Sequence, residues 1–180
     1  MNFVQPVRNL EKVDKMKEFL RNKSERDYIM FVLGITVGLR ISDILSLKKE
    51  DLLKTHIDIV EKKTRKRKRV KIPGYIKKEL FAYVNQLTDG SYVILSRQGT
   101  NKPIDRSTAY RILREAADHV NLKEIGTHTL RKTFGYHYYK QTKDVAMLQE
   151  LFNHTDQSTT LKYIGINQDL IDEAMDKFRI

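Results

Sequence analysis

The chain has 180 residues, a formal net charge of +11 and no cysteine. This length suits a single domain, and the absence of thiols excludes disulfides, thiolate metal sites and a cysteine nucleophile. No apolar run approaches the roughly 18 residues that a membrane span requires, and the N-terminus lacks the pattern of a signal peptide. We therefore expect a cytoplasmic protein that contacts no membrane.

The first third of the chain predicts three helices. Apolar residues recur at helical spacing over 9–23, and Ser24 can cap a second helix that contains the apolar run YIMFVLGIT. Gly38 can end that second helix, since glycine tolerates the left-handed conformation of a helix C-terminus. We expect Ser42 to cap a short third helix that carries Ile44, Leu45 and Leu47.

A strongly basic segment follows. Residues 56–61 alternate apolar and polar, as do residues 69–73, which predicts two strands of a β-hairpin. Eight of the ten residues in 62–71 are Lys or Arg, so the hairpin should be basic in its strands and tip. A local basic run favours a polyanionic partner such as DNA or RNA, although a solvated loop or a localisation tag has the same composition.

The rest of the chain predicts mostly helices. Pro73 begins one helix, residues 92–96 form a short extended segment, and helical patterns cover 106–119, 129–141, 144–152, 157–164 and 168–179. The predicted fold class is therefore mainly α with a small antiparallel β-sheet, in one domain over residues 1–180.

Three short stretches carry chemistry. In GITVGLRISDILSL, Arg40 stands between apolar runs, so it either satisfies an internal carboxylate or awaits an external anion. In HTLR, His128 and Arg131 have the spacing of one helix face. In LFNHTDQSTTLKYI, His154 lies in a turn and Tyr163 follows nine residues later. Each stretch, taken alone, has a simpler structural interpretation. Arg40 would form an ion pair, His128 and Arg131 would be a pair on a helix surface, and Tyr163 would pack in the core.

Together these stretches resemble the tyrosine recombinases, or phage-type integrases, and the resemblance covers essentially the whole chain. The resemblance implies that the chain has the catalytic-domain fold of that family and that it cleaves and rejoins double-stranded DNA. The implied catalytic residues are Arg40, Lys63, His128, Arg131, His154 and Tyr163. Asp43 matches a supporting acid of the family. Lys63 follows from aligning residues 69–73 with the family's second hairpin strand, and a slip in register would exchange it for Lys62, Lys66 or Lys68. The implied DNA contacts of the hairpin are Lys62, Arg65, Lys66, Arg67, Lys68 and Arg69.

The chemistry of phosphodiester cleavage agrees with this set. Tyr163 can attack phosphorus and store the bond as a 3′-phosphotyrosine, while Arg40 and Arg131 hold the non-bridging oxygens. His154 can donate a further hydrogen bond to these oxygens. His128 can take the tyrosine proton or orient the phosphate, and Lys63 can protonate the departing 5′-oxygen.

Two further expectations concern the nucleophile and cofactors. The positive cluster should favour the phenolate form of Tyr163. Tyr136, Tyr138 and Tyr139 are rival tyrosines, but they follow HTLR and lack the trailing position, so we interpret them as packing residues. No metal-ligand cluster and no glycine-rich phosphate loop is evident, so we expect no cofactor.

The resemblance leaves alternatives in function. Type IB topoisomerases share the residue set and only relax supercoils, and a DNA-binding regulator could use the same fold without chemistry. The target site, and integration as opposed to excision, cannot be read from the residues.

Both ends of the chain bear on assembly. Only about nine residues precede the body of the first predicted helix, so we expect the family's N-terminal core-binding domain to be absent. The chain would then be either an excised domain or a natural short protein, and we favour the latter. In the tail, residues 166–180, an apolar stripe recurs at helical spacing. It either folds back on its own domain or docks on a neighbour, which would give a free monomer and a homo-oligomer on DNA.

Overall fold

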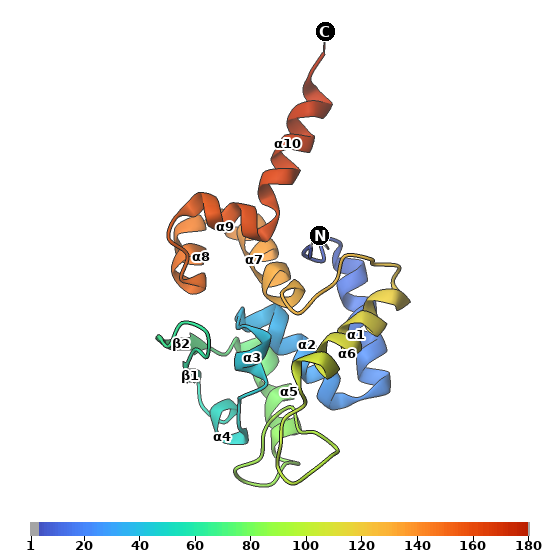
Figure 1. Ribbon diagram of the computed structural model, residues 1–180, viewed down its shortest axis with the longest axis vertical. Helices are drawn as coiled ribbons and strands as arrows, with labels where there is room; N and C mark the ends of the chain where they lie inside the picture. The colour runs from blue at the N-terminus through green and yellow to red at the C-terminus, as the bar shows by residue number, and fades with distance from the viewer. Residues whose placement is uncertain (1–3, 180) are drawn as a thin grey trace.

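The computed structural model describes residues 4–179, which form ten helices and one two-stranded sheet (Figure 1). The helices are α1 (Leu10–Lys23), α2 (Glu25–Val37), α3 (Ile41–Ile44), α4 (Lys49–Leu52), α5 (Gly74–Val84), α6 (Arg106–His119), α7 (Thr129–Thr142), α8 (Val145–Phe152), α9 (Gln157–Ile164) and α10 (Ile166–Lys177). The strands are β1 (His56–Val60) and β2 (Arg67–Lys71). Most of the chain is gathered in one body, from which α10 projects (Figure 1).

Local capping explains where the first two helices begin and end. The Asn9 side chain accepts a hydrogen bond from the Lys12 amide and caps α1, and the Ser24 side chain accepts one from the Asp27 amide and caps α2. Gly38 ends α2 in the left-handed conformation, at φ 64°. A Cβ at Gly38 would also lie 2.5 Å from the ring of Phe134. The turn at Gly38, two residues before Arg40, is therefore tightly packed against Phe134.

The sheet is an antiparallel hairpin, as predicted. His56 pairs with Lys71 and Val60 pairs with Arg67, so the tip between the strands spans residues 61–66. The second strand begins two residues earlier than the alternation at 69–73 predicted, because Arg67 and Lys68 also pair with β1. The exposed tip therefore lies close to the residues at the end of β1.

One prediction about the short helices was wrong, and one short helix was missed. Ser42 does not cap α3: it lies inside that helix, and Arg40 occupies the N-cap position without a side-chain cap bond. The sequence pattern also gave no sign of α4, which is only four residues long. A helix of one turn shows too little periodicity to be recognised.

Buried apolar side chains form two clusters. The larger runs from Val7 to Leu130 and is built mainly on α1 to α6. The smaller consists of five buried side chains from α7 to α10: Tyr136, Leu148, Phe152, Ile164 and Ile166. Helix α7 joins the two, since Leu130 belongs to the larger cluster and Tyr136 to the smaller. The turns that carry the candidate residues lie where these clusters meet.

None of the helices in the described part of the chain is both long enough and apolar enough to cross a membrane.

Candidate active site

Arg40 faces a buried carboxylate that belongs to the hairpin. Its Nη1 atom lies 2.8 Å from Oε1 of Glu61, whose side chain is fully buried, while the Arg40 side chain is 15% exposed. Neither of these two atoms has a well-aligned hydrogen-bond partner within residues 4–179, so charge holds the pair. The sequence left open whether Arg40 meets an internal carboxylate or an external anion. The structure shows the internal carboxylate, and the remaining exposure leaves the guanidinium reachable from outside.

Arg131 joins the two halves of the site. It lies in the first turn of α7, where Nη1 donates to the Gly38 carbonyl at 2.8 Å and Nη2 donates to the Phe152 carbonyl at 3.1 Å. Its guanidinium also stacks 4.3 Å from the centre of the Phe152 ring. Burial lowers the pKa of Arg131 to about 10, still far above neutrality, so the residue is a fixed positive charge.

Tyr163, on α9, lies among aromatic and basic groups. Its hydroxyl is 3.3 Å from Nδ1 of His128, and its ring centre is 5.1 Å from that of His154. The ammonium group of Lys132 lies 5.1 Å from the centre of the same ring. The structure thus brings the last predicted residue of the set beside both predicted histidines.

The acidity of Tyr163 differs from the expectation. Burial raises the pKa of its hydroxyl, and the charges of Arg131 and Arg40 lower it, but the net direction is upward. The expected effect of the cations is present, although burial outweighs it in the DNA-free protein. Tyr163 is therefore protonated at neutral pH, and its attack requires a proton acceptor.

Both histidines are biased toward the neutral form. Burial, then the charges of Arg106, Lys63 and other neighbouring cations, lowers the pKa of His128. Burial and the charges of Arg131 and Arg40 lower the pKa of His154. Rather than lying on a helix face with Arg131, His128 occupies the N-cap of α7, from which its side chain reaches Tyr163. A neutral imidazole beside a protonated phenol is a suitable proton acceptor.

The hairpin presents two lysines very differently. Lys63 lies in the exposed tip, close enough for its charge to lower the pKa of His128. Lys68 lies on β2 with a side chain only 8% exposed, 3.7 Å from Glu61, and donates to the Leu151 carbonyl. Burial and the charges of Arg131 and Arg40 lower the pKa of Lys68 to about 8, against the opposing effect of Glu61.

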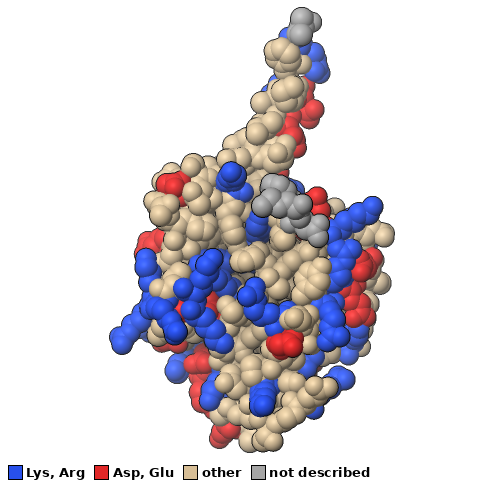
Figure 2. All heavy atoms as spheres, in the orientation of Figure 1, with Lys and Arg blue, Asp and Glu red and all other residues tan. Residues whose placement is uncertain are grey.

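The other predicted residues of the hairpin lie at its surface. Those exposed to solvent are Lys62, Arg65, Lys66, Arg67 and Arg69. Blue side chains gather over the edge of the molecule where the hairpin lies (Figure 2). Asp43, the predicted supporting acid, is 1% exposed, and its Oδ1 accepts a hydrogen bond from the Lys62 amide at 3.0 Å. It therefore ties α3 to the beginning of the hairpin tip.

Three residues of this cluster were missed from the sequence. Glu61 contacts Arg40 and Lys68, Asn153 donates to Glu61 Oε2 at 3.1 Å, and Phe152 packs against Arg131, His154 and Tyr163. Glu61 is the only acid in 59–71 and directly precedes the basic run, which was the available signal. Asn153 and Phe152 carry no such signal, since one caps a helix in the left-handed conformation and the other is a core residue.

The rival tyrosines lie elsewhere in the smaller cluster. The Tyr136 hydroxyl donates to Asp169 at 2.8 Å, and burial together with that bond raises its pKa to about 12. Tyr138 and Tyr139 are partly buried and pack against the smaller cluster. Within residues 4–179, none of these three hydroxyls forms a hydrogen bond with His128, His154 or Arg131, whereas the Tyr163 hydroxyl lies within hydrogen-bond distance of His128.

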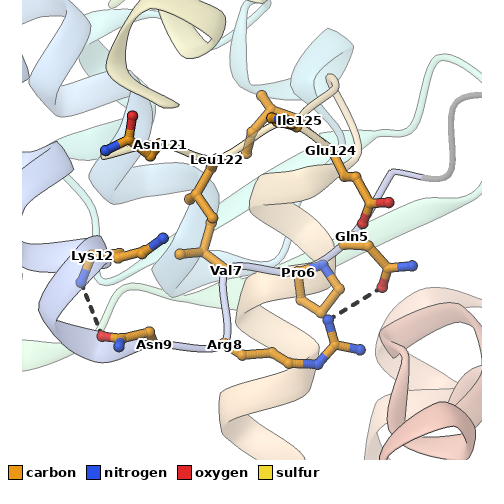
Figure 3. A pocket seen from close by; sticks show the side chains of 11 residues that line it. Gln5, Pro6, Val7, Arg8, Asn9, Lys12, Asn121, Leu122, Glu124 and Ile125 are labelled. Carbon is orange, nitrogen blue, oxygen red and sulfur yellow. Dashed lines mark hydrogen bonds between the residues drawn. The ribbon is translucent and has the colours of Figure 1, made fainter. Parts of the chain in front are cut away.

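A separate hollow of about 470 Å³ lies between the N-terminal segment and the loop that precedes α7 (Figure 3). Its lining includes Val7, Leu122 and Ile125, and Arg8 donates to the Gln5 side chain at its edge. No predicted catalytic residue lines it, so the clustered charges, and not this hollow, define the candidate site.

Two arginines, two neutral histidines and a tyrosine hydroxyl thus converge where the two apolar clusters meet. Within residues 4–179 no three His, Asp or Glu side chains are grouped as metal ligands. Such an arrangement suits transfer of a phosphoryl group to a tyrosine, with charge supplied by arginine.

The comparisons with known proteins agree. Residues 9–169 match the model of the phage integrase family. The chain is 49% identical over 170 residues to the probable integrase/recombinase YoeC of Bacillus subtilis (strain 168), which covers 94% of this chain and 93% of YoeC. The chain therefore belongs to the phage integrase family of tyrosine recombinases.

Solved structures show that the fold is that of recombinase catalytic domains. The crystal structure of XerA recombinase matches with a TM-score of 0.75 at 22% identity, over 98% of this chain and 65% of that one. A lambda integrase dimer bound to a COC′ core site matches with a TM-score of 0.70 at 18% identity, over 91% of this chain and 48% of the integrase chain. The chain thus spans about half to two thirds of those two proteins. The predicted fold class, mainly α with a small antiparallel sheet, is confirmed.

Proposed function

We propose that Tyr163 is the nucleophile with which this protein cleaves and rejoins DNA strands, through a 3′-phosphotyrosyl intermediate. Membership of the family makes the protein a site-specific DNA recombinase, and the proposal adds which side chains perform each step. The observation that carries it is the meeting of the Tyr163 hydroxyl with His128, at 3.3 Å, in a site that also holds Arg131 and Arg40.

In the first step, the Tyr163 oxygen attacks the scissile phosphorus. Its proton passes to the neutral His128, since the raised pKa of Tyr163 and the lowered pKa of His128 leave the phenol protonated and the imidazole free to accept. The bond between phosphorus and the 5′-oxygen breaks, and that oxygen leaves with a proton from Lys63. Rejoining is the reverse reaction, in which a 5′-hydroxyl displaces Tyr163.

The arginines stabilise the charge that develops on the phosphorane. Both guanidinium groups are fixed before DNA arrives, Arg131 by two carbonyls and Arg40 by Glu61. Donors that are already in place need no reorganisation during the reaction, which is how such groups lower a barrier.

His154 supplies a further hydrogen bond only when it is protonated. Its Nδ1 lies 3.0 Å from the Thr160 hydroxyl, which itself donates to the Asp156 carbonyl, so Nδ1 is the donor of this pair. In the neutral ring, Nε2 is then an acceptor. A bound phosphate adds negative charge beside the ring, which raises its pKa and favours the doubly protonated form that can donate to oxygen.

Lys63 is preferred over Lys68 as the general acid. Lys68 is held between Glu61 and the Leu151 carbonyl, inside the cluster, whereas Lys63 is exposed at the tip and free to approach a leaving group on the DNA. The exposed hairpin residues add phosphate contacts, whose affinity should fall as salt rises.

A nicked duplex that traps the covalent intermediate tests the proposal. The wild-type protein should form a protein–DNA adduct, and Tyr163→Phe should form none while still binding the duplex. Tyr138→Phe, on α7 in the same cluster, is the matched control and should form the adduct. An adduct with Tyr163→Phe would reject this nucleophile.

The same assay addresses the cofactor and the alternatives. Adduct formation should persist in EDTA, because Arg40, Arg131 and Lys63 supply the positive charge, and a requirement for magnesium would contradict the proposal. Absence of any adduct would favour a binding regulator. Strand exchange between two duplexes would distinguish a recombinase from a topoisomerase-like activity.

The tail fits assembly on DNA. Helix α10 stands away from the body (Figure 1), and Leu170, Ile171, Met175 and Phe178 are 52–64% exposed. Asp169, at its base, is held by Arg8 at 2.9 Å and by the Tyr136 hydroxyl. The apolar stripe therefore does not fold back on the described part of its own domain, and the neighbouring protomer on a shared DNA site is the proposed partner.

Removal of residues 170–180 tests this assembly while leaving Asp169 in place. The truncated protein should still bind DNA and form the adduct, but should lose strand exchange. Light scattering should show a monomer in free solution and oligomers of the full chain with target DNA. Normal strand exchange by the truncated protein would reject the role of the tail.

A further inference from the structure

Glu61 makes several contacts besides the ion pair with Arg40. It is the first residue after β1 and its side chain is fully buried. Oε1 faces Arg40 at 2.8 Å, and Oε2 accepts from the Thr64 hydroxyl at 2.5 Å and from Asn153 at 3.1 Å. One carboxylate therefore contacts the first arginine, the turn that carries Lys63, and the loop before His154.

The backbone of Glu61 strengthens this junction. Its amide donates to the Lys66 carbonyl at 3.0 Å, and its carbonyl accepts from the Arg65 amide at 2.9 Å. These bonds close the hairpin tip on the residue itself. A side chain at this position is consequently fixed relative to the tip on one side and to Arg40 on the other.

The charge of Glu61 is needed for electrostatic reasons. Burial raises the pKa of this carboxyl, but the hydrogen bond of Thr64, the close contact with Arg40 and the charges of Arg40 and Lys68 outweigh it and lower the pKa, so the group is ionised. Buried cations without a counter-ion repel one another and resist desolvation. Glu61 is the carboxylate in direct contact with both Arg40 and Lys68 in the structure.

The geometry of Arg40 shows what this contact could achieve in the reaction. Within residues 4–179, the Arg40 side chain forms an ion pair with Glu61, in which Nη1 lies 2.8 Å from Oε1. A guanidinium has five N–H donors, so the remaining ones are left for the phosphate. Holding one edge of the fork restricts its orientation, and a catalytic donor misplaced by about 1 Å loses most of its effect.

Resting on the proposed function above, we propose that Glu61 is a positioning residue for strand cleavage: its buried carboxylate fixes the Arg40 guanidinium in the orientation that receives the scissile phosphate. Glu61 does not touch the DNA. It acts through Arg40, and its loss should slow the chemical step and leave DNA affinity nearly unchanged.

The test compares single-turnover cleavage of the nicked duplex with DNA binding measured separately. Glu61→Gln keeps the size of the side chain and an oxygen for Asn153, but removes the charge. Cleavage should slow roughly 10- to 100-fold, the range of a lost charge-assisted contact, while the dissociation constant for DNA should change less than about threefold. Glu79→Gln removes the charge of a carboxylate that pairs with Arg21 instead, and should leave cleavage unchanged.

A double-mutant cycle separates positioning from a general structural role. If Glu61 acts through Arg40, Glu61→Gln should add less than about twofold to the defect of Arg40→Ala. Glu61→Asp, which retains the charge, should recover part of the lost rate. Additive defects, or cleavage by Glu61→Gln at the wild-type rate, would overturn the inference.

Folding is followed by circular dichroism alongside. Should Glu61→Gln be unfolded, Glu61→Asp takes its place in the cycle, and an unfolded Glu61→Asp would show that the role is structural, which also overturns the inference. A wild-type adduct with an unaffected Glu61→Gln rejects only this inference. Failure of the wild-type protein to form any adduct rejects the proposed function, and the inference with it.

Discussion

The two apolar clusters divide the candidate site between them. The larger cluster carries Arg40 and the hairpin, and it contains many fully buried side chains, Phe31 and Leu39 among them. The smaller carries His154 and Tyr163 on five buried side chains. Arg40, which would bind the phosphate, is therefore supported by the larger apolar cluster, and Tyr163, which would attack it, is supported by the smaller one.

This difference in core size suggests which part of the site unfolds locally first. Local opening is easiest where few apolar contacts must be broken. Arg131 spans the boundary, since it bonds the Gly38 carbonyl on one side and the Phe152 carbonyl on the other. The position of Tyr163 relative to Arg40 thus depends on a small core and on one guanidinium.

The largest expected effect follows from emptying the smaller cluster. Phe152→Ala removes a fully buried ring that touches Arg131, His154 and Tyr163, and should lower the free energy of unfolding by about 3–5 kcal/mol. Urea unfolding measures this loss. Hydrogen exchange should accelerate in α8 to α10 and remain slow in α2.

Phe31→Ala is the matched change in the larger cluster, since that ring is also fully buried. Its cost should be similar, but hydrogen exchange should accelerate through the whole body. If both variants give the same exchange pattern, the two clusters unfold as one unit and the division is wrong.

The next effect concerns the residue at the boundary. Arg131→Ala should slow cleavage about 100-fold or more, by analogy with loss of an oxyanion donor. Arg131→Lys keeps a charge but lacks the planar guanidinium that bonds two carbonyls. Its cleavage rate should therefore exceed that of Arg131→Ala by less than about tenfold. Single-turnover cleavage measures both. Full recovery by lysine would mean that charge alone matters at this position.

A smaller effect should appear in the pH dependence of stability. The pKa of Lys68 is about 8 when folded and 10.5 by its ordinary value. Between these values the unfolded chain still binds a proton that the folded protein has lost, so this lysine makes stability rise with pH. Below pH 8 both states are protonated and the full cost of its burial remains.

Comparison with Lys68→Met isolates that contribution, because other titrations occur in both proteins. The unfolding free energy of the wild type, relative to the variant, should increase by about 1–3 kcal/mol between pH 7.5 and pH 10. Urea titrations at the two pH values give this difference. A constant or falling difference would mean that Lys68 is not buried as a perturbed amine.

Local signals in the sequence predicted much of the fold. Asn9, Ser24 and Gly38 act through neighbours within a few residues, so their helix ends could be recognised in advance. The six motif residues were named from their order along the chain, and the structure brings Arg40, Arg131, His154 and Tyr163 within mutual electrostatic influence. Their catalytic roles stay predictions.

What escaped prediction depends on distant contacts. The pairing of Arg40 with Glu61 joins residues 21 apart, and Asn153 reaches Glu61 across 92 positions. The raised pKa of Tyr163 results from burial by residues distant in the sequence, which no local sequence pattern predicts. The inward turn of Lys68, among the seven other basic residues of 62–71 that are all exposed, likewise depends on how the hairpin packs against α8.

The smallest effect on stability is expected on α10, which belongs to neither core over most of its length. Leu170 and Met175 are 52% and 64% exposed, so Leu170→Ser and Met175→Ser should change the free energy of unfolding by no more than about 0.5 kcal/mol. Ile166, at the start of the same helix, is 2% exposed, and Ile166→Ala should cost about 2–5 kcal/mol. The boundary of the smaller cluster would then fall within one helix.

Because the two serine variants leave the fold intact, any loss of strand exchange that they cause would come from the surface that α10 presents to another molecule. A large loss of stability from either serine change would show instead that the stripe is buried within its own chain in solution.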